Sequence, residues 1–485
     1  MDNNEDNERL LGHNQDAGDD DDQLHSFVPA FAPQSMNDED DFLIEDHRGQ
    51  EQDQVVLISN EPTTGKGFTY IVFYLLGIGT MTPWNFFVTA EDYWKYKFRN
   101  TTSNSTDPDE ELTPLQLSFT CDLALAATLS GTIFLILNAI YGHHVSLRTK
   151  MLGTLWTICV LFGVTTGFVE INTDNWQEQF FLITLGIVVI LNISAATMSG
   201  ALYGVAGLFP SEYMTAVVSG QALGGILTAL AFILVLAFDT GPKITAFIFF
   251  IVGGVLILLC IVCYLAMARQ PYFKYYLDGG DKYEVISAIP SHSRHGGEGE
   301  TGGMPLEPIV REVLSQIYIH AVCLALLYVT TLSVYPAVTV LMQSEYSDQH
   351  TEWTDVYYLP VVNYLFFNCG DYFGRLLAGW FERPANVDTS LLFTIARIFL
   401  VPCFLFSNTN EHHFMPTIIK HDSTFIIMMI LFALSNGYLT NILLIMAPRS
   451  VRQHEKELAS SIMAAALSVG MAFGSLLSLA FVQML

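Results

Sequence analysis

Long apolar runs alternate with short polar connections from about residue 66 to the end of the chain. Most runs are roughly 20 residues long, the length that a helix needs to cross a hydrocarbon core of about 30 Å. In hydrocarbon every backbone group must be paired within the protein, which uniformly apolar runs achieve only as helices. The pattern therefore predicts an all-α polytopic membrane protein with eleven transmembrane helices, at 68–90, 117–140, 151–169, 180–209, 214–238, 244–268, 317–340, 356–380, 391–406, 425–447 and 457–484.

One long polar segment divides these runs into two groups. Residues 269–316 are rich in Gly, Ser, Glu and His, and they separate six runs from five. Transporters are often built from two groups of helices with the substrate site between them. We therefore predict an N-terminal six-helix bundle at 66–268, a linker at 269–316 and a C-terminal five-helix bundle at 317–485.

The N-terminal tail, residues 1–65, has a composition unlike that of the rest of the chain. It holds 18 acidic and 2 basic residues, and so contributes more than half of the net charge of -27. A polyacidic segment with few aromatic residues cannot bury enough surface to offset its ordering entropy, and we predict that it is disordered. Its charge also argues against nucleic acid as a partner, because phosphate binding requires clustered Lys and Arg.

The same tail contains three acidic dileucine-type sequences. Each consists of an acidic residue followed by two apolar residues: Asp6 with Leu10 and Leu11, Glu39 with Leu43 and Ile44, and Asp53 with Leu57 and Ile58. Such a sequence binds as a short extended peptide, and it predicts recognition by clathrin-adaptor proteins and sorting to late endosomes and lysosomes. The alternative is a solvated tail with no sorting role, which would leave the protein in the plasma membrane.

The distribution of Lys and Arg between the loops predicts the orientation. If the N-terminus is cytoplasmic, the cytoplasmic segments between and beside the runs carry 12 of these residues and the exterior loops carry 5. Membrane proteins carry an excess of Lys and Arg on the cytoplasmic side. With eleven spans the C-terminus is then lumenal or extracellular, and the N-glycosylation sequons at Asn100 and Asn104 both lie in the first exterior loop.

Asp371 and Arg375 are a charged pair inside the eighth apolar run. They are four residues apart and therefore share a helix face. A single charge near the bilayer centre costs about 2.5–3.5 kcal/mol on insertion scales, so charges at this depth usually have a function or a partner. We interpret the pair as a polar substrate site, with a buried structural ion pair as the alternative. Trp84, at the end of the first run, would stack on a planar ligand or belong to an interfacial aromatic belt.

Several short sequences resemble the equilibrative nucleoside transporter family, solute carrier family 29, and the resemblance covers about residues 66–485. The matching stretches are Pro83-Trp84-Asn85, Tyr203 to Pro210, Ser219-Gly220-Gln221, Phe367-Asn368 with Asp371 and Gly374-Arg375, and Ser435 to Leu439. The resemblance implies a major-facilitator-like fold in which two bundles rock around a central site. It also implies ATP-independent transport of nucleosides or nucleobases, with no enzymatic activity, cofactor or metal.

The resemblance further implies that Trp84, Asp371 and Arg375 line the substrate site. Many members have a glutamine where this chain has Ser199, whose hydroxyl cannot reproduce the paired donor and acceptor of an amide. The acidic tail and Ser199 are most similar to the intracellular, lysosomal branch. For a lysosomal protein, partial burial of Asp239 would raise its pKa toward the lumenal range and make this carboxylate a proton sensor. A transporter of organic cations or monoamines remains the alternative function.

Overall fold

The computed structural model describes residues 62–100, 113–142, 145–238, 241–277, 306–383, 386–408 and 416–485. Within these ranges the regular structure is helical, and β-structure is limited to isolated bridges such as Ser407–Ile419. Ten of the described helices are long and apolar enough to cross a membrane. The all-helical character predicted from the apolar runs is confirmed.

The N-terminal half contains six long helices, which coincide with the first six predicted runs. They are α1 (Lys66–Thr89), α3 (Pro114–Tyr141), α4 (Leu147–Glu170), α5 (Gln177–Leu208), α6 (Ser211–Phe238) and α7 (Pro242–Met267). Two short helices adjoin them, α2 (Glu91–Lys97) after α1 and α8 (Pro271–Leu277) after α7.

The C-terminal half contains α9 (Leu306–Leu332), α10 (Phe366–Phe381), α11 (Val387–Ile398), α12 (Leu400–Leu405), α13 (Asp422–Arg449) and α14 (Lys456–Met484). Short 3₁₀ helices lie at Thr339–Leu341, Ser347–Gln349 and Gln453–Glu455. The eighth predicted run, 356–380, is divided between α10 and two π-helical segments, Trp353–Tyr357 and Leu359–Leu365. It is not among the ten long helices, so the count of eleven spans stays a prediction.

The seventh run differs from its predicted bounds of 317–340. Helix α9 begins at Leu306, inside the segment predicted as a linker, and ends at Leu332. The chain then turns, and Pro336 lies in this turn. Proline has no backbone N–H and cannot continue a helical hydrogen-bond ladder, so the apolar sequence after Leu332 does not extend the helix.

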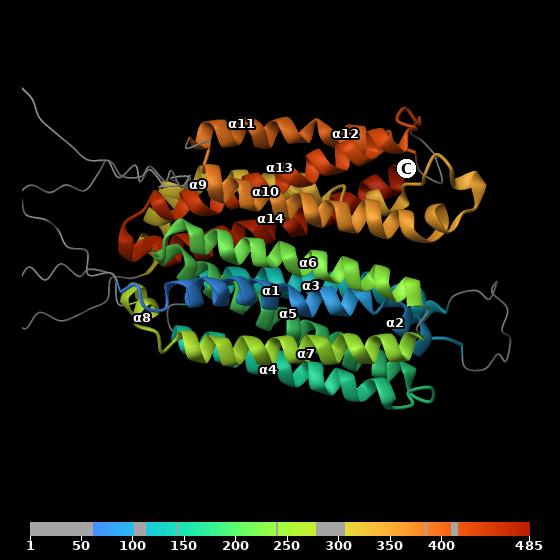
Figure 1. Cartoon of the computed structure of the whole chain (residues 1–485), viewed down its shortest axis with the longest axis horizontal. Helices are drawn as coiled ribbons and strands as arrows, with labels where there is room; N and C mark the ends of the chain where they lie inside the picture. The colour runs from blue at the N-terminus through green and yellow to red at the C-terminus, as the bar shows by residue number, and fades with distance from the viewer. Residues whose placement is uncertain are drawn as a thin grey trace, which may run out of the picture. The chain divides into compact units, whose positions relative to one another are not determined.

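Helices of each half pack mainly with one another. In the N-terminal half α1 packs against α5, α6 and α7, and α4 packs against α5 and α7. In the C-terminal half α9 packs against α11, α13 and α14, and α10 packs against α13. The two halves meet where α6 contacts α10 and where α14 contacts α3 and α5 (Figure 1). The candidate site lies beside the α6–α10 contact.

The contact between α1 and α6 depends on glycine. Gly220 of α6 lies against the backbone carbonyl of Tyr74, and Gly77 of α1 lies against the carbonyl of Val217. A Cβ atom at either glycine would overlap the facing carbonyl oxygen. Small residues permit such close backbone approach between membrane helices, where van der Waals packing replaces hydrophobic burial as the driving force.

The outward helix faces are apolar, as a bilayer requires. On α7, Val255, Leu259 and Val262 are exposed, whereas Ile257 and Tyr264 are buried against neighbouring helices. Soluble proteins rarely expose large contiguous apolar patches. This surface therefore suits contact with lipid.

Candidate functional site

Asp371 and Arg375 form an ion pair within α10. The distance between Arg375 Nη2 and Asp371 Oδ2 is 2.8 Å. The two residues are 5% and 7% exposed, respectively. The predicted shared helix face is thus observed, and both charges are removed from solvent.

Close packing of α10 against α13 buries the pair. Gly437 of α13 lies against the backbone carbonyl of Asp371, and Gly374 of α10 lies against the carbonyl of Leu434. A Cβ at either glycine would overlap that carbonyl oxygen. The two glycines therefore set the distance between the helices, and with it the position of the carboxylate.

A chain of three polar residues reaches the other oxygen of Asp371. Asn436 Nδ2 donates to Asp371 Oδ1 at 2.7 Å. The Asn436 Oδ1 atom accepts from Thr331 Oγ1 at 2.8 Å, and Arg397 Nη1 donates to Thr331 Oγ1 at 3.1 Å. Because a carboxylate in a low-dielectric interior needs partners for both oxygens, these hydrogen bonds fix the orientation of Asp371.

Arg397 of α11 is a second buried cation near the pair. It is 4% exposed, and its Nη2 donates to the carbonyl of Phe432 at 2.9 Å. The guanidinium carbon lies 4.4 Å from the centroid of the Phe432 ring, a cation–π geometry. Sequence reasoning missed Arg397, although a charge inside the short ninth apolar run was a usable signal.

Arg375 also connects α10 to the N-terminal half. Its Nη1 donates to the backbone carbonyl of Val218 on α6 at 2.6 Å. Asn441 of α13 makes a parallel connection, because its Nδ2 donates to Thr215 Oγ1 at 3.0 Å and to the Arg375 carbonyl at 2.7 Å. The charged site therefore lies at a contact between helices from both halves.

Two tyrosines from different halves lie near the guanidinium. Tyr203 of α5 and Tyr328 of α9 are both buried near Arg375. The Tyr203 hydroxyl donates to Gln221 Oε1 at 2.6 Å, and Gln221 Nε2 donates to Thr80 Oγ1 at 3.1 Å. A polar network thus runs from the site back to α1.

The other predicted site residues are less directly connected. Trp84 is half-buried on α1, and Ser199 is 7% exposed on α5. Among the described residues, neither makes a hydrogen bond to Asp371 or Arg375. Their role in binding stays a prediction.

Of the remaining predicted residues, Asn100 is described, and it is exposed just after α2. Asp239, Asn104 and all nine tail residues assigned to sorting lie outside the described residues: Asp6, Leu10, Leu11, Glu39, Leu43, Ile44, Asp53, Leu57 and Ile58.

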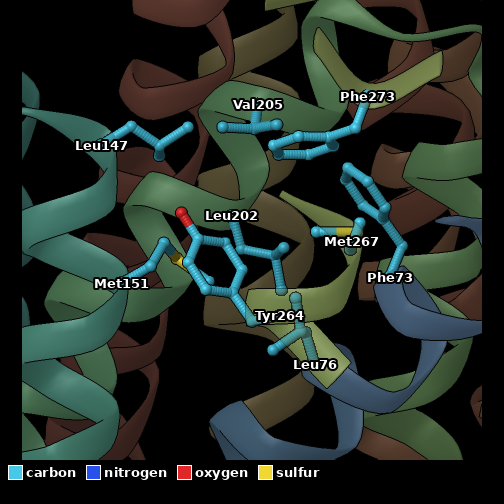
Figure 2. Close-up of a pocket in the computed structure, with 9 residues that line it drawn as sticks. All are labelled: Phe73, Leu76, Leu147, Met151, Leu202, Val205, Tyr264, Met267 and Phe273. Atoms are coloured by element: carbon cyan, nitrogen blue, oxygen red, sulfur yellow. The ribbon is translucent and has the colours of Figure 1, made fainter. Parts of the chain in front are cut away.

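A small cavity in the N-terminal half does not suit a polar ligand. Figure 2 shows its nine lining side chains, which come from α1, α4, α5, α7 and α8. Of these side chains only Tyr264 carries an oxygen. The cavity volume is about 10 Å³, close to the space for one water molecule. The Asp371–Arg375 pair, rather than this cavity, is the candidate site.

The pair and its partners offer a specific chemistry. Asp371 accepts one hydrogen bond on each oxygen from the protein, and a carboxylate has further lone pairs. The Nε of Arg375 is buried and has no hydrogen-bond partner among the described residues. An acceptor beside a planar donor suits a solute with hydroxyl and carbonyl groups.

Several known proteins to which this chain is similar in sequence are nucleoside transporters by name. Residues 185–483 match the family described as "Nucleoside transporter". The chain is 32% identical over 461 residues to equilibrative nucleoside transporter 2 of Mus musculus, covering 88% of this chain and 99% of that protein. It is 30% identical to equilibrative nucleoside transporter 3 of Rattus norvegicus, covering 84% of this chain and 87% of that protein.

Solved structures agree on the fold. The chain aligns with the human organic anion transporter MFSD10 (TETRAN) at a TM-score of 0.50 and 12% identity, covering 86% of this chain and 95% of that chain. At this identity the likeness concerns the fold alone. The chain has a polytopic, major-facilitator-like helical fold.

Proposed function

Because this chain belongs to the equilibrative nucleoside transporter family, we propose that it transports nucleosides across a membrane, driven by the substrate gradient alone. Nucleobases are a second substrate class, and organic cations or monoamines are the alternative. The observation that carries the proposal is the buried Asp371–Arg375 pair at a contact between the two halves. The named activity of the relatives agrees with it.

The pair supports recognition of a ribose better than recognition of a cation. Asp371 is already neutralised by Arg375 at 2.8 Å. A cationic substrate would need an acidic group that is not already paired, whereas ribose hydroxyls need only acceptor capacity on the carboxylate. Arg375 supplies donors for a hydroxyl or for a base carbonyl. Trp84 and Ser199 complete the proposed site, with Trp84 stacking on the base.

The proposed orientation places the N-terminus in the cytoplasm and the C-terminus on the lumenal or extracellular side. The excess of Lys and Arg in the predicted cytoplasmic segments supports it. The exposed position of Asn100, next to α2, is compatible with glycosylation on the opposite side. Tryptic digestion and endoglycosidase treatment of intact vesicles test both assignments.

For the location, we favour late endosomes and lysosomes, reached through adaptor binding to the acidic tail. Replacing the six apolar residues of the three tail sequences with Ala should move the protein to the cell surface. These residues are Leu10, Leu11, Leu43, Ile44, Leu57 and Ile58. A matched variant with six Ser or Gln residues of the tail replaced controls for nonspecific effects. An unchanged distribution of the tagged Leu/Ile variant would remove the sorting role.

The central experiment is uptake by proteoliposomes that contain the purified full chain and no ATP. Saturable flux of labelled adenosine or uridine is the expected result, and a labelled monoamine is the comparison. Counterflow by unlabelled nucleoside should accelerate uptake, as expected of a carrier with a single alternating site. A folded protein that carries the monoamine and no nucleoside would support the alternative function.

A further inference from the structure

Asn363 is a buried carboxamide with both polar atoms unused. It is 1% exposed, and neither its Oδ1 nor its Nδ2 has a hydrogen-bond partner among the described residues. Burying an unpaired amide costs free energy, so an orphaned group of this kind needs an explanation. Of the asparagines near the charged pair, Asn436 uses both polar atoms and Asn441 uses its Nδ2, whereas its Oδ1 also has no partner among the described residues.

Asn363 lies on the same helix stripe as the charged pair. Residues 363, 367, 371 and 375 follow one another at intervals of four, and all four are buried. Residues four apart lie on one face of a regular α-helix, and Asn363, near the end of the π-helical segment, is the one member of this stripe that lies outside α10. At 1.5 Å per residue, eight residues place Asn363 at most about 12 Å along the helix from Asp371.

An aromatic wall separates these two polar ends. Phe367, midway along the stripe, stacks on Tyr335 with ring centroids 3.6 Å apart and an interplanar angle of 9°. The stripe therefore has a charged end, an aromatic centre that is packed against Tyr335 and an amide end, and this order matches the ribose, ring and hydrogen-bonding edge of a nucleoside.

The local backbone is also unusual at this point. Asn363 belongs to the π-helical segment Leu359–Leu365, which changes to regular α-helix at Phe366. π-Helical turns are rare and occur frequently at functional sites, because they shift side chains relative to the regular helix. This segment packs against α6, the helix whose Val218 carbonyl binds Arg375. The amide and the charged pair thus share one helix–helix contact.

We propose that the carboxamide of Asn363 recognises the hydrogen-bonding edge of the base. This inference rests on the proposed nucleoside transport and deepens it. A carboxamide offers a donor and an acceptor side by side, as the edge of adenine does. The single hydroxyl of Ser199 cannot offer such a pair. Asn363 is thereby a specificity-determining residue, and its missing protein partners are supplied by the substrate.

The test compares two substrates in proteoliposomes that contain the full chain. Adenosine and purine riboside share the ribose and the ring system, but purine riboside lacks the exocyclic amino group. The variants are Asn363→Leu and the smaller Asn363→Ala, and the matched control is Asn192→Leu. Asn192 is half-buried on α5 and, among the described residues, donates within its own helix to the Val188 carbonyl at 2.9 Å.

In the Asn363 variants we expect kcat/KM for adenosine to fall about tenfold while that for purine riboside changes less than threefold. The control should keep the parent ratio. Thermal stability should not fall in Asn363→Leu, because no hydrogen bond within the protein is lost. An equal fall for both substrates, or an unchanged ratio, would overturn the inference and leave nucleoside transport standing. A folded parent that carries neither substrate would overturn both proposals.

Discussion

Asp371 and Arg375 allow a test that separates a structural ion pair from a binding site. Asp371→Asn leaves the buried guanidinium without its counter-ion, although Asn at this position still accepts from Asn436. Arg375→Met leaves a buried carboxylate and also removes the bond to the Val218 carbonyl. Breaking a buried pair by removing one partner typically costs about 3–5 kcal/mol. Both single variants should therefore be clearly less stable than the parent.

The double variant, Asp371→Asn with Arg375→Met, leaves no buried charge without its partner. It lacks the ion pair and the Arg375–Val218 bond, and a hydrogen bond from a charged donor contributes about 1.5–3 kcal/mol. We therefore expect it to be less stable than the parent by about that amount, and more stable than Arg375→Met. A simple sum of two independent losses would instead place it well below either single variant.

Stability and transport are measured on the same preparations. The buried thiols of Cys260 and Cys323 react with a fluorogenic maleimide when heat opens the protein, which reports the unfolding midpoint. Arg449→Met is the control, because Arg449 pairs with Glu382 at 2.8 Å on a half-exposed surface and exposed pairs contribute at most about 1 kcal/mol.

The two readouts should diverge in the double variant. Stability should recover relative to Arg375→Met, whereas nucleoside uptake should remain absent, since both proposed recognition groups are gone. Recovery of uptake together with stability would show that the pair is only structural. A midpoint of the double variant below both single variants would refute the assumed coupling between the two charges.

Three further predictions concern other parts of the chain. Lys97 is buried, its Nζ donates to two carbonyls at the end of α4, and burial lowers its pKa from 10.5 to about 8. Burial of the charged ammonium lowers the free energy of unfolding fully below pH 8, and this loss declines as the pH rises toward 10.5. Raising the pH from 7.5 to 9.5 should therefore increase the free energy of unfolding of the parent more than that of Lys97→Met. Equal responses of the two proteins to pH would contradict this. Gly220→Val should abolish folded protein in size-exclusion chromatography, because its side chain would overlap the Tyr74 carbonyl, whereas Gly153→Val, at an open position, should fold. If Asp239 senses lumenal pH, uptake should be faster at an exterior pH of 5.5 than at 7.4, and Asp239→Asn should be fast at both; equal flux in the parent would refute the sensor.

The sequence predicted the helices well because the bilayer constrains them strongly. A run of about 20 apolar residues has essentially one structural solution in hydrocarbon, and the first six runs match α1 and α3 to α7 closely. The ends were less predictable where a turn decides them. The run that continues past Leu332 is apolar enough for a span, but a turn that contains Pro336 ends the helix first.

At the site, the sequence predicted the contact between residues four positions apart, but it did not predict the partners that are distant along the chain. The pairing of Asp371 with Arg375 follows from a separation of four residues on one helix. The contacts to Asn436 and Val218 join residues 65 and 157 positions apart. Only the folded packing of α6, α10 and α13 brings these groups together. The π-helical segment that contains Asn363 likewise has no pattern of apolar residues that distinguishes it from an ordinary helix.

The position of Arg375 suggests how substrate binding and helix movement are coupled in the proposed carrier. Its guanidinium binds Asp371 on its own helix and the Val218 carbonyl on α6. A substrate oxygen that takes the donor now used by Val218 would exchange a bond between the two halves for a bond to the ligand. A bond of about 1.5–3 kcal/mol corresponds to roughly a ten- to hundredfold bias in an equilibrium. A ligand shifts a conformational equilibrium only through its different affinity for the two states. If the donor becomes available only when α6 and α10 separate, the loaded carrier favours separation and the empty carrier regains the Val218 bond. A contact of this strength shifts the conformational equilibrium of the loaded and of the empty carrier without holding either in one conformation. A carrier driven by the substrate gradient alone requires such a moderate shift.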